Sequence, residues 1–137
     1  MLEAPPAVGR QPSAPVLCYH RIGGPLELGV TRVSAATFRR QMEALARTGW
    51  STLALSDFAL SGLTPGPRPG ANRPRRFLLT FDDGYASLVE HAYPILADLG
   101  FTATTFLITD FVGRTNSWDV PYALRRLQHL DWPTIER

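Results

Sequence analysis

Residues 76–85 read Arg76-Phe77-Leu78-Leu79-Thr80-Phe81-Asp82-Asp83-Gly84-Tyr85. Side chains of a strand alternate between two faces, and in residues 76–81 both faces carry apolar side chains. This is typical of a strand buried on both sides of a parallel sheet. Two carboxylates and a glycine follow it directly. Because the chemistry of α/β folds lies at the carboxyl ends of parallel strands, this stretch indicates both the fold class and the place of a functional site.

The rest of the chain alternates strands and helices around this run. The predicted strands cover 15–20, 50–55, 76–81 and 101–108. The predicted helices run from an N-cap at Ser34 to a stop at Gly49, over 56–61, and over 86–99 with a kink at Pro94 and a stop at Gly100. Such alternation predicts an α/β fold with parallel strands and right-handed crossovers.

The two ends of the chain differ from this pattern. Residues 1–14 are rich in proline, alanine and glycine without periodicity, which predicts a disordered leader before a domain that spans 15–137. After Asp110 we expect a loop over 116–119, a helix over 121–130, and a last helix capped by Asp131. Four strands are too few to close a parallel barrel. The sequence therefore predicts an open sheet edge and inner strand face, and with them a tendency to self-associate.

Composition excludes several classes of protein. The 137 residues are 45% hydrophobic and 19% charged, with a formal net charge of +2. This is an ordinary soluble domain, without the basic, aromatic-flanked surface that nucleic-acid binding requires. The densest basic stretch, Arg68 to Arg76, lies among prolines and glycines and is read as a solvated loop rather than a phosphate-binding patch. No apolar run is long enough to span a bilayer, and residues 1–6 lack the features of a signal peptide, so the compartment stays open.

The single cysteine, Cys18, excludes an intrachain disulfide. It lies inside the apolar run 15–20, and we predict that it is a small buried hydrophobic residue.

Asp82 and Asp83 are the first candidates for chemistry. Adjacent residues of a strand point to opposite faces, so two neighbouring carboxylates are not expected to serve one ligand in the same role. A division of labour fits better, in which one carboxylate binds a cation and the other accepts protons, while Gly84 permits a sharp turn. The alternative is that Asp82, Asp83 and Gly84 form a turn and cap the following helix.

The motif Thr80-Phe81-Asp82-Asp83-Gly84-Tyr85 resembles the first motif of the polysaccharide deacetylase family (carbohydrate esterase family 4, the NodB-homology domain). The resemblance continues through Tyr93-Pro94-Ile95-Leu96 and residues 99–107. The leading run over 16–22 resembles the opening strand of the poly-N-acetylglucosamine deacetylase branch. The resemblance thus extends from about Pro15 to the end. It implies a (β/α)7-type barrel, of which this chain supplies the N-terminal part and lacks the C-terminal half.

The resemblance also implies an activity. Members of the family remove N-acetyl groups from an amino-sugar polysaccharide with a divalent metal, usually zinc, and are usually extracytoplasmic or associated with the cell envelope. The residue that matches Asp82 is the general base and the one that matches Asp83 is a metal ligand. His20, at the end of the first strand, matches a candidate general acid, although a histidine hydrogen-bonded at a strand end remains open. Trp118 and Tyr85 could stack on a sugar ring or could equally belong to the core.

One departure from the family stands out. Two further metal ligands should come from a His-x-x-x-His motif, whereas the histidines here are His20, His91 and His129, and no two have that spacing. We predict an exposed position for His91 and assign no role to His129. The sequence leaves two rivals open: a truncated, non-catalytic remnant, and a magnesium-dependent phosphohydrolase, which the lack of a phosphate-cradling glycine loop disfavours. We expect the functional unit to include residues beyond Arg137.

Overall fold

The computed structural model describes residues 14–24, 31–61, 74–117 and 126–137. Its central element is β5 (Arg75–Phe81), the strand that the sequence places at the middle of the fold. One edge of β5 pairs in parallel with β1 (Val16–Tyr19). The other edge pairs in parallel with β4 (Trp50–Leu53) along its first half and with β6 (Thr104–Thr105) at its end. The predicted α/β fold with parallel strands is confirmed.

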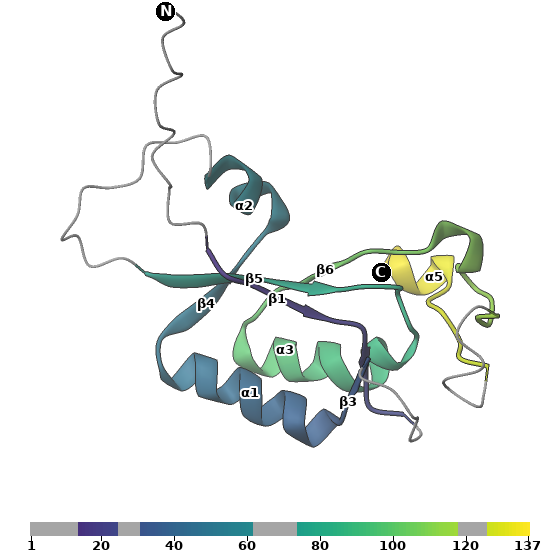
Figure 1. Ribbon diagram of the computed structural model, residues 1–137, viewed down its shortest axis with the longest axis horizontal. Coiled ribbons are helices and arrows are strands. Elements are labelled where there is room, and N and C mark those ends of the chain that lie inside the picture. Colours follow the sequence, from purple (N-terminus) through teal and green to yellow (C-terminus); the bar gives the residue numbers. More distant parts are fainter. Residues whose placement is uncertain (1–13, 25–30, 62–73, 118–125) are drawn as a thin grey trace, which may run out of the picture.

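Two helices cover one face of this sheet. Helix α1 (Ala35–Arg47) and helix α3 (Tyr93–Leu99) lie side by side against it (Figure 1). Phe77, Leu79 and Phe81 of β5 face these helices and are fully or almost fully buried. They share the core with residues of β1 and of both helices: Leu17, Tyr19, Phe38, Met42, Ile95 and Leu96. Leu78 and Thr80, on the opposite face, are buried too, so β5 is enclosed on both sides as its sequence predicts.

Local signals set the ends of α1 as predicted. The Ser34 hydroxyl accepts a hydrogen bond from the backbone N–H of Thr37 at 3.1 Å, which satisfies one free donor of the first turn. Gly49 follows the helix with φ +77°, a left-handed conformation in which glycine pays no steric penalty. The predicted N-cap at Asp131 is confirmed in the same way: its side chain accepts a hydrogen bond from Thr134 N–H at the start of α5 (Trp132–Ile135).

The predicted helix over 86–99 has two parts. A π-helical segment, η1 (Leu88–Ala92), comes first, and α3 begins at Tyr93 with Pro94 in its first turn. Proline has no N–H to donate to a preceding turn and is tolerated at a helix start. The predicted kink at Pro94 therefore takes the form of a change in helix type. Gly100 ends α3 with φ +65°, as predicted.

Several predicted boundaries are wrong. Only Thr104 and Thr105 of the predicted strand 101–108 pair with β5, because β4 already occupies the first half of that edge. The strand at Trp50 stops at Leu53, and α2 (Leu55–Ser61) begins two residues later. The sequence analysis places no strand between His20 and the helix capped by Ser34, whereas the structure has a short parallel pair there, β2 (Arg21–Ile22) and β3 (Arg32–Val33).

The last part of the chain also differs from its prediction. Gln128 and His129 form isolated bridges to Thr115 and Tyr85, so the helix expected over 121–130 does not reach its predicted end. A short 3-10 turn, η2 (Thr109–Phe111), precedes this region. Predictions for Trp118, for most of the leader 1–14 and for the arginines at 68 and 73 lie outside the described residues.

Cys18 is exposed, contrary to the prediction that it is buried. Alternation along β1 sends Leu17 and Tyr19 to the helix-covered face, and it sends Val16 and Cys18 to the other. An apolar run shows that a strand is buried on at least one face, but not which of its residues face the core.

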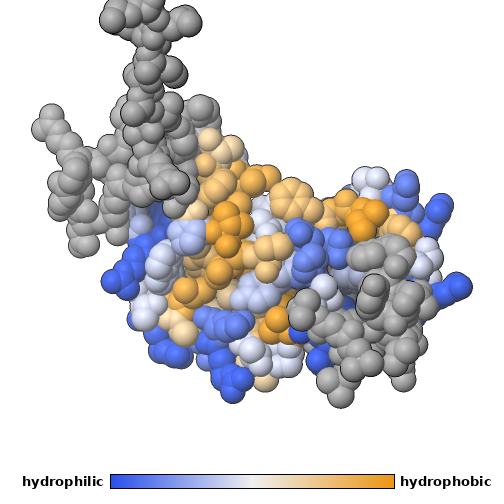
Figure 2. Space-filling view, viewed as in Figure 1, coloured by the Kyte–Doolittle hydropathy of each residue, from blue (hydrophilic) through white to orange (hydrophobic). Residues whose placement is uncertain are grey.

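Large apolar side chains remain on the surface: Val16, Leu55, Phe106 and Trp132. Figure 2 shows apolar residues gathered in a band across the visible face of the molecule. No helix within the described ranges has the length and hydropathy to cross a membrane. Self-association through these surfaces stays a prediction.

Candidate active site

The site is built where β1 and β5 end. The strands are in parallel register, with Cys18 beside Thr80, and the pairing continues as Asp82 N–H donates to Tyr19 C=O at 2.8 Å. Asp82 follows Thr80 by two residues and His20 follows Cys18 by two. All three side chains, Cys18, His20 and Asp82, therefore gather on the sheet face that α1 and α3 do not cover. The Cys18 thiol donates to Asp82 Oδ2 at an Sγ–O distance of 3.3 Å.

Asp83 reaches the same place by a different route. Its φ is +68°, and that of Gly84 is +66°, so two consecutive residues adopt the left-handed conformation immediately after the strand. Gly84 N–H closes the turn by donating to Asp82 C=O at 2.9 Å. This turn brings Asp83 Oδ2 to 3.2 Å from Nδ1 of His20.

The two carboxylates thus converge, although strand alternation predicts that they point to opposite faces. The prediction is wrong because Asp83 is no longer extended. Aspartate is one of the few residues other than glycine that enter the left-handed region with some frequency. The two carboxylates have different partners, since Asp82 accepts a hydrogen bond from a thiol and Asp83 faces an imidazole. The expected difference in role stays a prediction.

His129 holds this turn in place, although the sequence gave it no role. Its buried ring stacks between Tyr85 and Phe111, with centroid distances of 4.7 and 5.4 Å. Its Nδ1 lies 2.8 Å from the backbone carbonyl oxygen of Asp83, and since a carbonyl can only accept, Nδ1 carries the proton. Tyr85 is therefore a core aromatic of the turn, which favours the second of its two predicted readings.

The backbone around His129 reinforces the same turn. Leu130 N–H donates to Gly84 C=O at 2.8 Å, and Ala86 N–H donates to Gln128 C=O at 2.9 Å. On its other side this segment is bonded to the chain near Asn116, whose Oδ1 accepts from Leu127 N–H at 2.6 Å. The sequence next to His129 gives no sign of these contacts, because the carbonyl group that its ring binds belongs to Asp83, 46 residues away along the chain.

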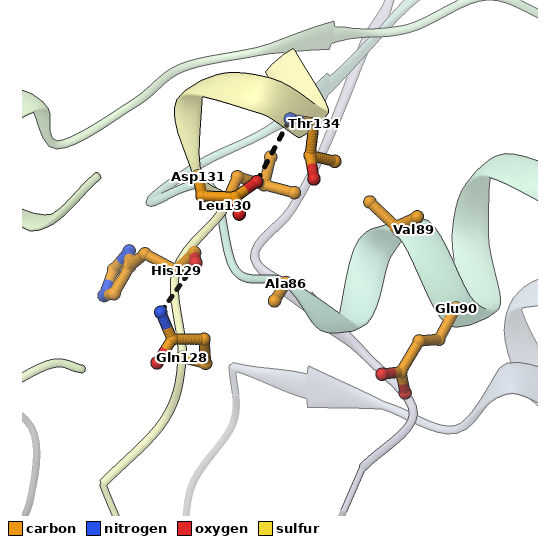
Figure 3. A pocket seen from close by; sticks show the side chains of 8 residues that line it. All are labelled: Ala86, Val89, Glu90, Gln128, His129, Leu130, Asp131 and Thr134. Carbon is orange, nitrogen blue, oxygen red and sulfur yellow. Dashed lines mark hydrogen bonds between the residues drawn. The ribbon is translucent and has the colours of Figure 1, made fainter. Parts of the chain in front are cut away.

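A shallow pocket lies beside this segment but is not the site. It is lined by residues of η1 and of the C-terminal segment: Ala86, Val89, Glu90, Gln128, His129, Leu130, Asp131 and Thr134. Figure 3 shows the His129 ring turned away from Val89 and Glu90, on the far side of its own backbone. Asp82, Asp83 and His20 do not line this pocket, so no chemistry is assigned to it.

His91 has a packing role. Its ring fills the space beside Gly23, where a β-carbon would overlap the imidazole. The side chain is about one-third exposed, so the prediction of an exposed histidine is only partly correct.

Electrostatics at Cys18 keep the thiol protonated. Partial burial is the largest cause that raises the pKa of Cys18, and the hydrogen bond to Asp82 and the negative charges of Asp82 and Asp83 raise it further. A hydrogen bond from Thr80 opposes these effects. A thiol with a raised pKa remains the donor to Asp82 at neutral pH.

The donor atoms can hold a cation. Ligand atoms of Cys18, His20 and Asp82 all lie within 4.8 Å of one another, and Asp83 joins them through His20. Thiolate, imidazole and carboxylate are the ligands that zinc takes in proteins. The residues present therefore fit a divalent metal of the zinc type better than magnesium, which prefers oxygen ligands throughout.

Comparison with known proteins decides the family. A family model described as "Polysaccharide deacetylase" matches residues 70–133, which contain the carboxylate turn. The Bacillus subtilis (strain 168) protein named "Putative polysaccharide deacetylase YxkH" is 35% identical over 99 residues, which are 72% of this chain. The chain belongs to the polysaccharide deacetylase family. The resemblance carried by residues 80–85 is thus confirmed.

Solved structures of deacetylases share the fold. IcaB from Ammonifex degensii is 25% identical, with a TM-score of 0.70 over 90% of this chain. The Streptococcus pyogenes deacetylase PplD, solved in complex with acetate, is 27% identical, with a TM-score of 0.57 over 70% of this chain. The chain spans 33% of the length of YxkH, 47% of IcaB and 42% of PplD. It thus corresponds to part of a deacetylase barrel.

Replacing Gly84 by alanine should destabilise the fold more than the same change at Gly100. Both glycines have a φ near +65°, so alanine costs about 1–2 kcal/mol at either position. Only at Gly84 would the new β-carbon also lie 2.6 Å from Leu107 Cδ2. Because Leu107 Cδ2 is the end of a flexible side chain that can shift, the added cost lies toward the lower end of the about 1–3 kcal/mol typical of overpacking. Urea unfolding of the two variants measures the difference, and equal losses would show that Leu107 does not confine the turn.

Replacing Asp82 by asparagine should speed alkylation of Cys18 by iodoacetamide at pH 8. Removing the negative acceptor lowers the pKa of Cys18, which raises the thiolate fraction. The intrinsic nucleophilicity of the thiolate falls at the same time, so each pKa unit yields about a threefold net gain in rate. Asp57→Asn, at an exposed position in α2, is the control. An unchanged rate in Asp82→Asn would contradict the thiol–carboxylate contact.

Proposed function

We propose that the protein carrying this chain removes N-acetyl groups from an amino-sugar polysaccharide by hydrolysis of the amide bond. Asp82 is the general base, Asp83 is a metal ligand and His20 is the general acid. The observation that supports this assignment is that both carboxylates lie near His20 and have different closest partners. Asp82 accepts a hydrogen bond from the Cys18 thiol, whereas Asp83 Oδ2 lies 3.2 Å from His20 Nδ1. This arrangement lies at the end of the buried central strand, where α/β enzymes place their chemistry.

The relatives support the proposed class of substrate. YxkH is named for polysaccharide deacetylation, and PplD was solved with acetate, the product of deacetylation. The opening strand over 16–22 resembles that of the poly-N-acetylglucosamine deacetylase branch. A polymer of N-acetylglucosamine is therefore the substrate we favour.

The surroundings of each residue are consistent with its proposed role. A divalent metal such as zinc, held in part by Asp83, would polarise the acetamide carbonyl and acidify a water molecule when bound. Asp82 accepts the proton of the attacking water, and the Cys18 thiol fixes the orientation of its carboxylate through Oδ2. His20 directs Nδ1 toward Asp83, which leaves Nε2 to protonate the departing amine. Asp83 and Asp82 thus act on different partners in one reaction.

Two rival functions remain to be separated from this one. A non-catalytic remnant would carry the same turn without activity. A magnesium-dependent phosphohydrolase is less consistent with the site, because sulfur and nitrogen donors lie among its carboxylates.

The test is acetate release by the longest natural form of the protein from N-acetylglucosamine oligomers. We expect acetate in proportion to free amine, loss of activity on chelation and recovery with zinc. A phosphate monoester, offered in parallel, should not be hydrolysed. A folded, metal-replete protein that releases no acetate from any N-acetylated oligomer would contradict the proposal and favour the remnant.

A further inference from the structure

Three different metal-binding side chains meet at the carboxyl ends of β1 and β5. The ligand atoms of Cys18, His20 and Asp82 all lie within 4.8 Å of one another. Strand register places them there, since Cys18 pairs beside Thr80, Asp82 follows Thr80 by two residues, and His20 follows Cys18 by two. This trio leaves out Asp83, which the proposed reaction uses as a metal ligand, and it includes a thiol that the reaction uses only to orient Asp82.

The distances suit tetrahedral coordination. With a zinc–sulfur bond of about 2.3 Å and a zinc–oxygen bond of about 2.0 Å, tetrahedral zinc holds its sulfur and oxygen ligands about 3.5 Å apart. Cys18 Sγ and Asp82 Oδ2 are already 3.3 Å apart. A cation that binds between them replaces the thiol proton, which passes to solvent. The His20 side chain is 36% exposed, so its ring has room to close the remaining distance.

We propose that Cys18, His20 and Asp82 form a second binding site, selective for thiophilic divalent ions such as zinc. The sulfur ligand selects zinc, cadmium and cobalt over magnesium and calcium, which bind oxygen. The site needs no side chain from outside this chain, because two strand ends supply all three ligands. A fourth position is left to water, as at zinc sites with three protein ligands.

Occupation of this site should inhibit the enzyme, an inference that rests on the proposed function. A metal ion there takes the lone pairs with which Asp82 and His20 would accept and deliver protons. Zinc would then have two opposite effects: it would activate at low concentration through the ligand set that includes Asp83, and inhibit at higher concentration through Cys18.

Cobalt titration of the 137-residue chain tests the binding directly. A thiolate bound to Co²⁺ gives a near-ultraviolet charge-transfer band, and Cys18 is the only cysteine that can produce it. We expect the band to saturate at one ion per chain, to disappear on adding zinc and to be indifferent to magnesium. Saturation at one ion per two chains would show a site shared between copies and would overturn the proposal.

Four variants identify the ligands. Cys18→Ala should abolish the band, and His20→Ala and Asp82→Asn should each weaken cobalt binding at least about tenfold, since even outer partners of metal ligands contribute about 10–100-fold. His91→Ala is the matched control, a histidine that packs against Gly23 away from the trio, and should bind as the parent does. A band that persists unchanged in both His20→Ala and Asp82→Asn would reveal an isolated thiol, and no band at all would equally overturn the proposal.

The longest natural form supplies a second measurement that does not depend on how the short chain folds. The difference spectrum between this form and its Cys18→Ala variant should contain the same band, and its absence would refute the site. Zinc inhibition of acetate release, normalised to the highest rate of each protein, should need at least about tenfold more zinc in Cys18→Ser. If no acetate is released at all, the proposed function fails while the cobalt band still decides the binding site.

Discussion

The site depends on a short turn in the left-handed conformation. Asp83 and Gly84 leave β5 with φ values of +68° and +66°, and this reversal carries the Asp83 carboxylate to the face where Asp82 already lies. An aspartate in this region stores strain, which persists only where surrounding structure holds it. The Nδ1–H of His129 supplies that constraint by donating to the Asp83 carbonyl, while Tyr85 and Phe111 fix the ring between them. The C-terminal segment thus supports the turn that carries the two carboxylates, although its side chains take no part in the proposed reaction.

Because both carboxylates lie near His20, this residue takes part in both proposals, the deacetylation and the metal site with Cys18 and Asp82. Its Nδ1 faces Asp83, while its ring also lies within ligand distance of Cys18 and Asp82. A residue shared in this way links the proposed deacetylation to the proposed thiol-containing site, because one imidazole cannot serve both fully at once. Cys18 distinguishes the thiol-containing site from the catalytic one. Its sulfur favours borderline and soft metals, whereas carboxylates alone do not select for such metals.

The sequence predicts those features that neighbouring residues determine among themselves. The buried run of β5, the Ser34 and Asp131 caps and the glycine stops at Gly49 and Gly100 are each read within a few residues and are confirmed. The family also followed from a short motif, Thr80 to Tyr85. The exposure of Cys18 could not be read in this way, because an apolar run does not reveal which of its alternate residues face the helices. His129 was missed for a stronger reason: its stacking partners and the carbonyl it binds come from other segments, and a lone histidine near a chain end carries no signal of them.

The two adjacent carboxylates are assigned separate roles, and one comparison tests this assignment most directly. Asp82→Asn and Asp83→Asn would be made in the longest natural form and dialysed until the weaker site of Cys18, His20 and Asp82 is empty. The two variants would then be assayed together for the metal that remains bound and for acetate release from N-acetylglucosamine oligomers. Asp82→Asn should retain its metal and lose activity by about 10²–10⁴-fold, the usual contribution of a general base. Asp83→Asn should lose both metal and activity. Full metal in Asp83→Asn, or normal acetate release by Asp82→Asn, would contradict the assignment of ligand and base.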